Sequence, residues 1–326
     1  MRAVVLEKFG GPLEIREVAR PLPGTGQALV RVASSGVNPL DTKISAGQAA
    51  HARVQPPAIL GLDLAGVIEE IGEGVTGFAP GVAVYGLTGG VGDLQGSLAE
   101  YVTVDARLLA PAPTRLDLRR AAALPLVSIT AWEGLVDRAK VHAGQKVLVH
   151  GGAGGVGHIA IQIARSRGAE VFATDAPERL TTVEELGAAP IDFTRPVDDY
   201  VAEHTGGEGF DIVYDTVGGA VLDDSFSAAK IHTGHVVSSL GWGTHSIAPL
   251  SFRGGTYSGV FSLLPMLTGR GRDHHGEILR EITTLVDGGK LTPLVDPRRF
   301  TLAEAAAAHT ALTDRSANGK IVVDVH

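Results

Sequence analysis

The chain has 326 residues, more than one hydrophobic core usually serves, so its length predicts two domains. Its formal net charge is −8 with the acids dispersed, which argues against nucleic acid as the main partner. It contains no cysteine, and this removes disulfides, catalytic thiols and thiolate zinc sites together.

The first part of the chain consists of short apolar segments separated by glycine and proline. Several of them alternate between apolar and polar residues, as half-buried strands do. The expected strands are 3–6, 13–18, 28–34, 64–71, 82–85 and 98–104. Residues 1–122 are therefore predicted to form a β-rich domain.

From about Ala123 the rhythm changes to strand, helix, strand. The expected strands are 147–150, 171–174, 191–193, 212–215 and 236–240, with a further candidate at 256–261. Strands that alternate with helices favour a doubly wound parallel sheet. Residues 123–261 are predicted to form this second domain.

The tail of the chain is expected to contain a helix that ends at Val286, a second helix over 302–312 and a last strand over 320–325. A six-stranded nucleotide-binding sheet offers this last strand no neighbour. We therefore expect residues 262–326 to complete the first domain.

Two features of the sequence bear on membranes. No apolar run is long enough to span a bilayer. The chain reaches an acid already at Glu7, too early for a signal peptide. We expect a soluble, cytoplasmic protein without a membrane partner.

The most informative motif is a glycine cluster between an apolar strand and an amphipathic segment at 158–167. Gly152, Gly154 and Gly157 have the G-x-G-x-x-G spacing, which permits a tight turn, close approach to a pyrophosphate, and close packing of helix on strand. The N–H groups at the start of the helix then face the ligand. A second strand ends at Asp175, an acid at the spacing of a ribose contact. A glycine-rich loop without a ligand is the alternative, but the strand–turn–helix context favours a dinucleotide site.

Several stretches carry a resemblance to a known family over nearly the whole chain. They are Gly36–Asp41, Leu64–Val75, Gly81, Val84–Gly86, Leu126–Trp132, Ala153–Gly157, Tyr214–Gly219 and Gly319–Val322. The chain resembles the medium-chain dehydrogenase/reductase superfamily, and within it the zinc-independent quinone oxidoreductase branch. The resemblance implies a GroES-like β-rich catalytic domain, a Rossmann domain with a doubly wound parallel sheet, and NADPH or NADH as cofactor.

The zinc ligands of metal-dependent relatives are missing here. Those relatives use a Gly-His-Glu segment and cysteines, whereas this chain has Leu62 in place of the histidine and no cysteine. The adjacent His274 and His275 lie in a stretch rich in glycine and arginine with no acid at ligand spacing. We interpret this stretch as a solvated loop and expect no metal site.

Without a metal, the chemistry depends on hydride transfer from a nicotinamide and on stabilising the oxygen that gains negative charge. A quinone or an α,β-unsaturated carbonyl fits as substrate. The resemblance implies that Asn38 lies by the nicotinamide, and Lys43 offers an ammonium that neutralises the oxyanion or delivers a proton. A solvated surface lysine is the alternative for Lys43. The resemblance places Lys43 at a position where some quinone reductases carry tyrosine and some enone reductases carry lysine, and Ala49 where a second tyrosine would fall, which favours an enone reductase over a quinone reductase.

The motif and the resemblance together give a set of cofactor-binding candidates. They are Asn38, Thr130, Gly152, Ala153, Gly154, Gly155, Val156, Gly157, Thr174, Asp175, Arg179, Ser239, Leu240, Gly241 and Lys320. Trp242, Tyr257 and Phe261 are candidates for an apolar substrate pocket, with core packing as the alternative. Asp175 favours NADH and the nearby Arg179 favours NADPH, so the cofactor preference stays open.

Two other functions remain open from the sequence. An acyl-thioester enoyl reductase would need a basic patch for the carrier's phosphates, for which Arg253, Arg270 and Arg272 form the only loose cluster. A nucleotide-binding protein without turnover is the other, although the acidic balance argues against RNA. We expect a small-molecule substrate, a homodimer and no nucleic-acid partner.

Overall fold

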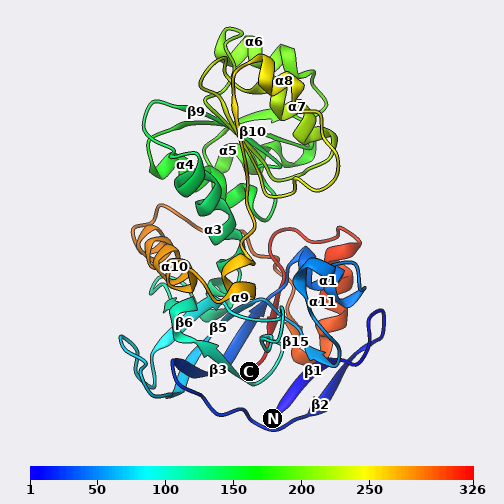
Figure 1. The fold of residues 1–326 in the computed structure, drawn as a ribbon, viewed down its shortest axis with the longest axis vertical. Helices are drawn as coiled ribbons and strands as arrows, with labels where there is room; N and C mark the ends of the chain where they lie inside the picture. Colours follow the sequence, from blue (N-terminus) through cyan, green and yellow to red (C-terminus); the bar gives the residue numbers. More distant parts are fainter. The chain divides into compact units, whose positions relative to one another are not determined.

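The computed structural model describes all 326 residues. Contacts between residues divide the chain into two compact units: unit 1 comprises Met1–Leu126 and Leu263–His326, and unit 2 comprises Val127–Ser262. In Figure 1 the blue, cyan, orange and red segments belong mainly to unit 1, and the green and yellow segments to unit 2. None of the helices combines the length and apolar character that a membrane span requires.

Unit 1 is rich in β-strands, as expected from the alternating segments, and most of its strand pairs are antiparallel. Its seven-stranded sheet contains β3 (Gln27–Gly36), β5 (Asp63–Ile71), β6 (Ala83–Leu87), β7 (Tyr101–Asp105), β8 (Leu109–Pro111), β15 (Phe300–Thr301) and β16 (Val322–Asp324). The alternation is visible in β7, where Val102 and Val104 are buried and the residues between them are partly exposed. A smaller sheet contains β1 (Arg2–Leu6), β2 (Leu13–Glu17) and β4 (Ala58–Ile59). All six strands expected over residues 1–122 are confirmed.

The end of the chain is part of the unit 1 sheet. Strand β16 pairs antiparallel with β3, so that Val322 lies opposite Gly36. The backbone N–H of Val37 then donates to the carbonyl of Ile321 at 2.9 Å. This pairing places the residues just before β16 beside the start of the first helix.

The helices of unit 1 are mostly short. They are α1 (Pro39–Ser45), α2 (Leu118–Ala121), α9 (Leu264–Thr268), α10 (Arg272–Asp287) and α11 (Ala305–Thr313), with 3₁₀ turns η1 (Ala50–Ala52), η2 (Ala106–Leu108) and η5 (Leu302–Glu304). The long helix α10 buries Ile278, Leu279 and Ile282, which share one face at helical spacing.

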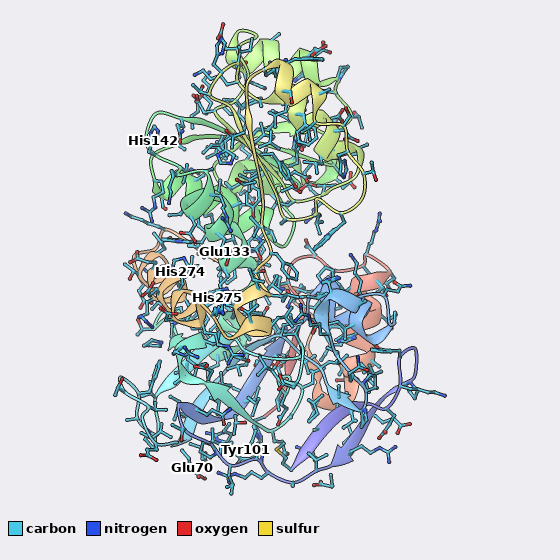
Figure 2. All side chains as sticks on the ribbon, viewed as in Figure 1. Glu70, Tyr101, Glu133, His142, His274 and His275 are labelled. Carbon is cyan, nitrogen blue, oxygen red and sulfur yellow. The ribbon has the colours of Figure 1, made fainter.

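The expectation of a solvated loop at His274 and His275 was wrong. Both residues lie in the first turn and a half of α10, and His275 is fully buried; Figure 2 shows the two side by side on that helix. The physical reason is Gly276. A Cβ at this position would collide with the Arg107 carbonyl oxygen, so the glycine permits close packing of α10 and does not mark a loop.

Unit 2 is a doubly wound parallel sheet, as predicted. Its strands are β9 (Lys146–His150), β10 (Glu170–Asp175), β11 (Ala189–Asp192), β12 (Ile212–Asp215), β13 (His235–Ser238) and β14 (Thr256–Gly259). They pair in the order β11-β10-β9-β12-β13-β14, and every pair is parallel. The chain order reverses between β9 and β12, and in open sheets of this kind the carboxyl ends of the strands at the reversal form the ligand site.

Helices precede and connect the strands of unit 2. They are α3 (Pro125–Trp132), which continues as the π-helix η3 (Glu133–Arg138), α4 (Gly157–Ser166), the 3₁₀ turn η4 (Pro177–Arg179), α5 (Leu180–Glu185), α6 (Val197–Thr205), α7 (Ala220–Ala228) and α8 (Ala248–Phe252). The hydrophobic core of unit 2 combines aliphatic and aromatic side chains, and in it the rings of Phe172 and Phe210 pack edge to face with centroids 5.4 Å apart.

Candidate functional site

The glycine-rich turn leads from the end of β9 into α4. Only Gly151 in this turn has a positive φ, 73°, so the tight bend falls one residue before the first glycine of the motif. The N–H groups of Gly151 and Gly152 both donate to the carbonyl of Thr174 at 3.0 Å. The turn is therefore fastened to the end of the neighbouring strand β10.

The three glycines of the motif are required by close packing. A Cβ on Gly152 would lie 2.6 Å from the Ala173 Cβ, and one on Gly154 would lie 2.9 Å from the Gly151 carbonyl oxygen. A Cβ on Gly157 would collide with that same oxygen. Side chains are thus excluded from the turn, and its backbone stays accessible.

The turn has the free donors that a phosphate needs. The N–H groups of Gly155 and Val156 make no hydrogen bond within the protein, and they precede α4, a helix of ten residues. Free N–H groups at the positive end of a helix bind anions. On this structural test the turn fits the pyrophosphate of a dinucleotide.

Asp175 and Arg179 both contact Ala153, in the middle of the turn. The Asp175 carboxylate accepts the Ala153 N–H at 2.7 Å and the Ala176 N–H at 2.9 Å. The Arg179 guanidinium donates to the Ala153 carbonyl, and its Nε lies 3.9 Å from the Asp175 carboxylate. Asp175 is 9% exposed, whereas the Arg179 side chain is 41% exposed. A carboxylate and a guanidinium, which are opposite in charge, therefore lie together at one edge of the turn.

A buried polar cluster, of which the sequence reasoning singled out only Thr174, occupies the carboxyl ends of β9, β10, β12 and β13. The imidazole of His150 is hydrogen-bonded to the Thr174 hydroxyl at 2.9 Å, and burial lowers the pKa of His150 to about 4, so this ring is neutral. The Asp215 carboxylate accepts the Val217 N–H at 2.9 Å and the Ser238 hydroxyl at 2.6 Å. The signal was present in the sequence as a polar residue at the end of each apolar strand.

The segment after β13 is fixed by this cluster. The Ser239 N–H donates to the Asp215 carbonyl at 3.1 Å, and the Leu240 N–H donates to the Ser238 hydroxyl at 3.1 Å. A Cβ on Gly241 would collide with the Tyr257 hydroxyl. The predicted residues 239–241 thus lie between the polar cluster and Tyr257.

The three aromatic residues predicted for the substrate pocket fall into two groups. The rings of Trp242 and Phe261 pack edge to face with centroids 6.0 Å apart, and Trp242 is 53% exposed. Tyr257 packs against Phe226 instead, also with centroids 6.0 Å apart. Thr130 lies in α3, where its hydroxyl is 3.1 Å from that of Ser262.

Unit 1 contains a second polar cluster, formed by Asn38, Asp41, Asp63 and Lys320. Asn38 precedes α1 and is 1% exposed. Its backbone N–H donates to the Asp41 carboxylate at 2.8 Å, and its side-chain amide donates to the Asp63 carboxylate at 2.9 Å. The Lys320 ammonium donates to the Asn38 side-chain oxygen, and it lies 4.0 Å from the Asp63 carboxylate. Sequence reasoning singled out Asn38 and Lys320 separately but not their direct contact.

Burial dominates the protonation of this cluster. It raises the pKa of Asp41 to about 7 and that of Asp63 to about 6, and the Lys320 ammonium lowers both. Burial also lowers the pKa of Lys320, which the two carboxylates raise. One cation therefore faces two acids, and the group is electrically neutral when one acid carries a proton.

Lys43, the other predicted catalytic residue, lies in α1 outside this cluster. It is exposed, and its side chain makes no hydrogen bond or ion pair within the protein. Ala49, by contrast, is buried. Lys43 thus presents a solvated cation.

The chain is similar to known proteins both in sequence and in structure. Residues 24–114 match the alcohol dehydrogenase GroES-like domain, and residues 186–323 match the family described as zinc-binding dehydrogenase. The chain is 32% identical over 99% of its length to the chloroplastic NADPH-dependent alkenal/one oxidoreductase of Arabidopsis thaliana, and covers 79% of that protein. It is 31% identical over 99% of its length to the quinone oxidoreductase of Sus scrofa, and covers 97% of it.

A match of a different kind is the spectinabilin polyketide synthase system protein NorB of Streptomyces orinoci. It is 35% identical over 94% of this chain, which spans only 13% of that longer protein. Among solved structures, an alcohol dehydrogenase superfamily protein from Novosphingobium aromaticivorans is 57% identical, with a TM-score of 0.98 and complete coverage of both chains.

The residues present do not fit a zinc ion, although the name of one matched family implies one. The chain has no cysteine, and no group of three or more His, Asp or Glu side chains is placed to hold a metal. Asp63 follows Leu62, which has no donor atom, and the cation beside Asp63 is the Lys320 ammonium. No catalytic step is assigned to a metal.

Proposed function

The chain belongs to the medium-chain dehydrogenase/reductase superfamily, in its quinone oxidoreductase branch, and from this membership we propose that it uses NADPH or NADH to reduce a quinone or an α,β-unsaturated carbonyl. The relatives named for quinone and for alkenal/one reduction support this substrate class. The observation that carries the proposal is the glycine-rich turn with free N–H groups on Gly155 and Val156.

In unit 2, the residues of the turn hold the pyrophosphate and exclude side chains from its path. Thr130, Thr174 and residues 239–241 are proposed as further cofactor contacts. Asp175 and Arg179 face the adenosine end, where a carboxylate favours ribose hydroxyls and a guanidinium favours a 2′-phosphate. When bound, the nicotinamide cofactor supplies the hydride.

In unit 1, Asn38 and Lys43 are proposed to serve the acceptor's oxygen. The Asn38 amide has two N–H donors and gives one of them to Asp63, so the other remains for an oxygen that gains negative charge. Hydride adds to the electrophilic carbon of the acceptor, and the resulting enolate or phenolate takes a proton. The Lys43 ammonium, exposed on α1, is proposed as the donor of that proton. Lys320 is proposed to lie on the side of the site that contacts the cofactor.

The acceptor is proposed to bind against Trp242 and Phe261, with Tyr257 nearby in sequence on β14. The half-exposed Trp242 ring offers an apolar surface, and apolar walls with few polar groups are typical of small-molecule sites. The chain is further proposed to form a homodimer. Strand β14 is the edge of its sheet, and Phe252 just before it is 89% exposed, so the unit has an apolar surface and an unpaired strand edge to cover.

The proposal is tested by following NADPH and NADH oxidation with quinones, enones, enals and crotonyl-CoA as acceptors. We expect turnover with a quinone or an enone. Oxidation with crotonyl-CoA alone would identify a thioester enoyl reductase, a function for which Arg272 is poorly available because it is bound to Asp105 at 3.0 Å. Cofactor binding by calorimetry without oxidation by any acceptor would instead identify a nucleotide-binding protein. Light scattering coupled to gel filtration tests the dimer.

A further inference from the structure

The side-chain amide of Asn38 is held in one orientation by its two charged neighbours. Lysine only donates hydrogen bonds and a carboxylate only accepts them. The Asn38 oxygen therefore faces the Lys320 ammonium, and its nitrogen faces the Asp63 carboxylate. Rotating the amide by half a turn would place N–H against ammonium and oxygen against carboxylate.

The backbone fixes the position of the lysine. Gly319 has a φ of 111°, and a Cβ on it would lie 2.9 Å from the Leu294 carbonyl oxygen. The Lys320 N–H donates to that oxygen at 2.8 Å, and its carbonyl accepts the Asp296 N–H at 2.9 Å. The ammonium also donates to the Val37 carbonyl at 3.0 Å. Lys320 is 5% exposed, so this geometry shields it from water.

The orientation of Asn38 depends on the charge of Asp63. As a carboxylate, Asp63 accepts the Asn38 N–H. As a neutral acid it carries an O–H, which can donate to the Asn38 oxygen and stabilise the rotated amide. The Lys320 ammonium favours the charged form of Asp63. The other titratable group in the cluster is Asp41, from α1, whose pKa is raised by burial and by the charge of Asp63.

We propose that Lys320 is a positioning residue, which keeps Asp63 a carboxylate and thereby fixes the Asn38 amide with its second N–H available as a donor. This inference rests on the proposed function, in which that N–H serves the acceptor's oxygen. It assigns Lys320 a role exerted through Asn38. A lysine with a purely structural role would support folding but would not set the protonation of Asp63.

The test uses Lys320→Met, which keeps the stem and removes the charge, with the exposed Lys290→Met as control. The chain has two asparagines, Asn38 and Asn318, so selective ¹⁵N-asparagine labelling gives two pairs of side-chain amide signals. Asn318→Ser identifies which belongs to Asn38. This spectrum of the purified full chain, recorded against pH, reports the amide without any turnover, and kcat is measured over the same pH range.

We expect the Asn38 signal of Lys320→Met to titrate at least one pH unit higher than in the wild type, because loss of the cation disfavours the Asp63 carboxylate. The kcat should fall about tenfold at pH 7 and recover as the pH rises. The double variant Lys320→Met with Asp63→Asn should show the same fall in kcat but no recovery at higher pH. Because it leaves no unpaired charge at these two positions, it also serves as the test if Lys320→Met alone does not fold. An unchanged Asn38 titration, or wild-type kcat in the double variant, would overturn the inference. Absence of turnover in the wild type would refute the proposed function alone.

Discussion

Asp175 and Arg179 both bind the backbone of Ala153: the Asp175 carboxylate accepts the N–H of Ala153, and the Arg179 guanidinium donates to the Ala153 carbonyl. The two side chains hold the glycine-rich turn from one side and bring opposite charges to its edge. Cofactor preference is therefore expected to depend on both residues, in opposite directions.

The first prediction concerns this pair. Asp175→Ser removes a carboxylate that repels a 2′-phosphate and accepts ribose hydroxyls, so the ratio of kcat/KM for NADPH over NADH should rise about tenfold or more. Arg179→Ala should lower the same ratio, because it removes a cation that is 41% exposed. Steady-state kinetics with both cofactors measures the ratio. If neither variant changes it, these side chains do not face the ribose.

The second prediction concerns Gly157. A methyl group at this position would collide with the Gly151 carbonyl oxygen, so Gly157→Ala must move the helix start away from the turn. We expect a loss of about 1–3 kcal/mol in the free energy of unfolding and at least tenfold weaker cofactor binding. Gly24→Ala is the control, since its nearest atom would be the flexible amide end of Gln27 at 3.2 Å. Equal behaviour of the two variants would show that the turn tolerates a side chain.

The third prediction is a pH dependence of stability from Asp41. Burial raises its pKa from 3.8 to about 7, so the folded chain binds this proton more tightly than the unfolded chain. The resulting stabilisation is complete below about pH 4 and is lost as the pH rises through 7. Asp63 acts in the same direction, with a pKa of about 6.

The wild type should therefore lose free energy of unfolding from pH 5 to pH 8 that Asp41→Asn does not lose. The difference between the two proteins should shift in favour of the variant by on the order of a few kcal/mol. Urea unfolding at the two pH values measures this difference. The exposed Asp198→Asn serves as control and should follow the wild type. A wild type and an Asp41→Asn variant that respond equally to pH would mean that Asp41 is ionised throughout this range.

The fourth prediction concerns Lys43. If its ammonium serves the transition state, Lys43→Met should lower kcat and kcat/KM together and leave cofactor affinity nearly intact. Asn38→Ala should weaken both turnover and cofactor binding. Lys290→Met is again the control. Wild-type kinetics in the Lys43 variant would make Lys43 an ordinary surface lysine.

The fifth prediction follows from the missing metal ligands. Activity should persist after dialysis against a chelator, and elemental analysis should find no stoichiometric zinc, because neither Leu62 nor any cysteine can bind it. One tightly held zinc per chain that leaves together with activity would contradict this.

The positions of the strands along the chain and the glycine-rich turn could be predicted from the sequence because their signals are local. A strand is marked by a short run of apolar or alternating residues, and the turn by glycine spacing next to such a run. The interpretation of His274 and His275 as part of a loop failed for the opposite reason. Gly276 reflects the close approach of α10 to Arg107, and no local pattern distinguishes such a glycine from one in a loop.

The sequence by itself determined which chemical groups exist: a dinucleotide turn, no thiol, and an asparagine and two lysines as candidate donors. The tertiary structure decided which of these meet. Asn38 and Lys320 are 282 positions apart, yet the pairing of β16 with β3 brings them into contact beside Asp63. Burial, which depends on the whole fold, then sets the charges of Asp41 and Asp63. Lys43, five residues from Asn38 in sequence, lies in α1 outside that buried cluster and is exposed to solvent.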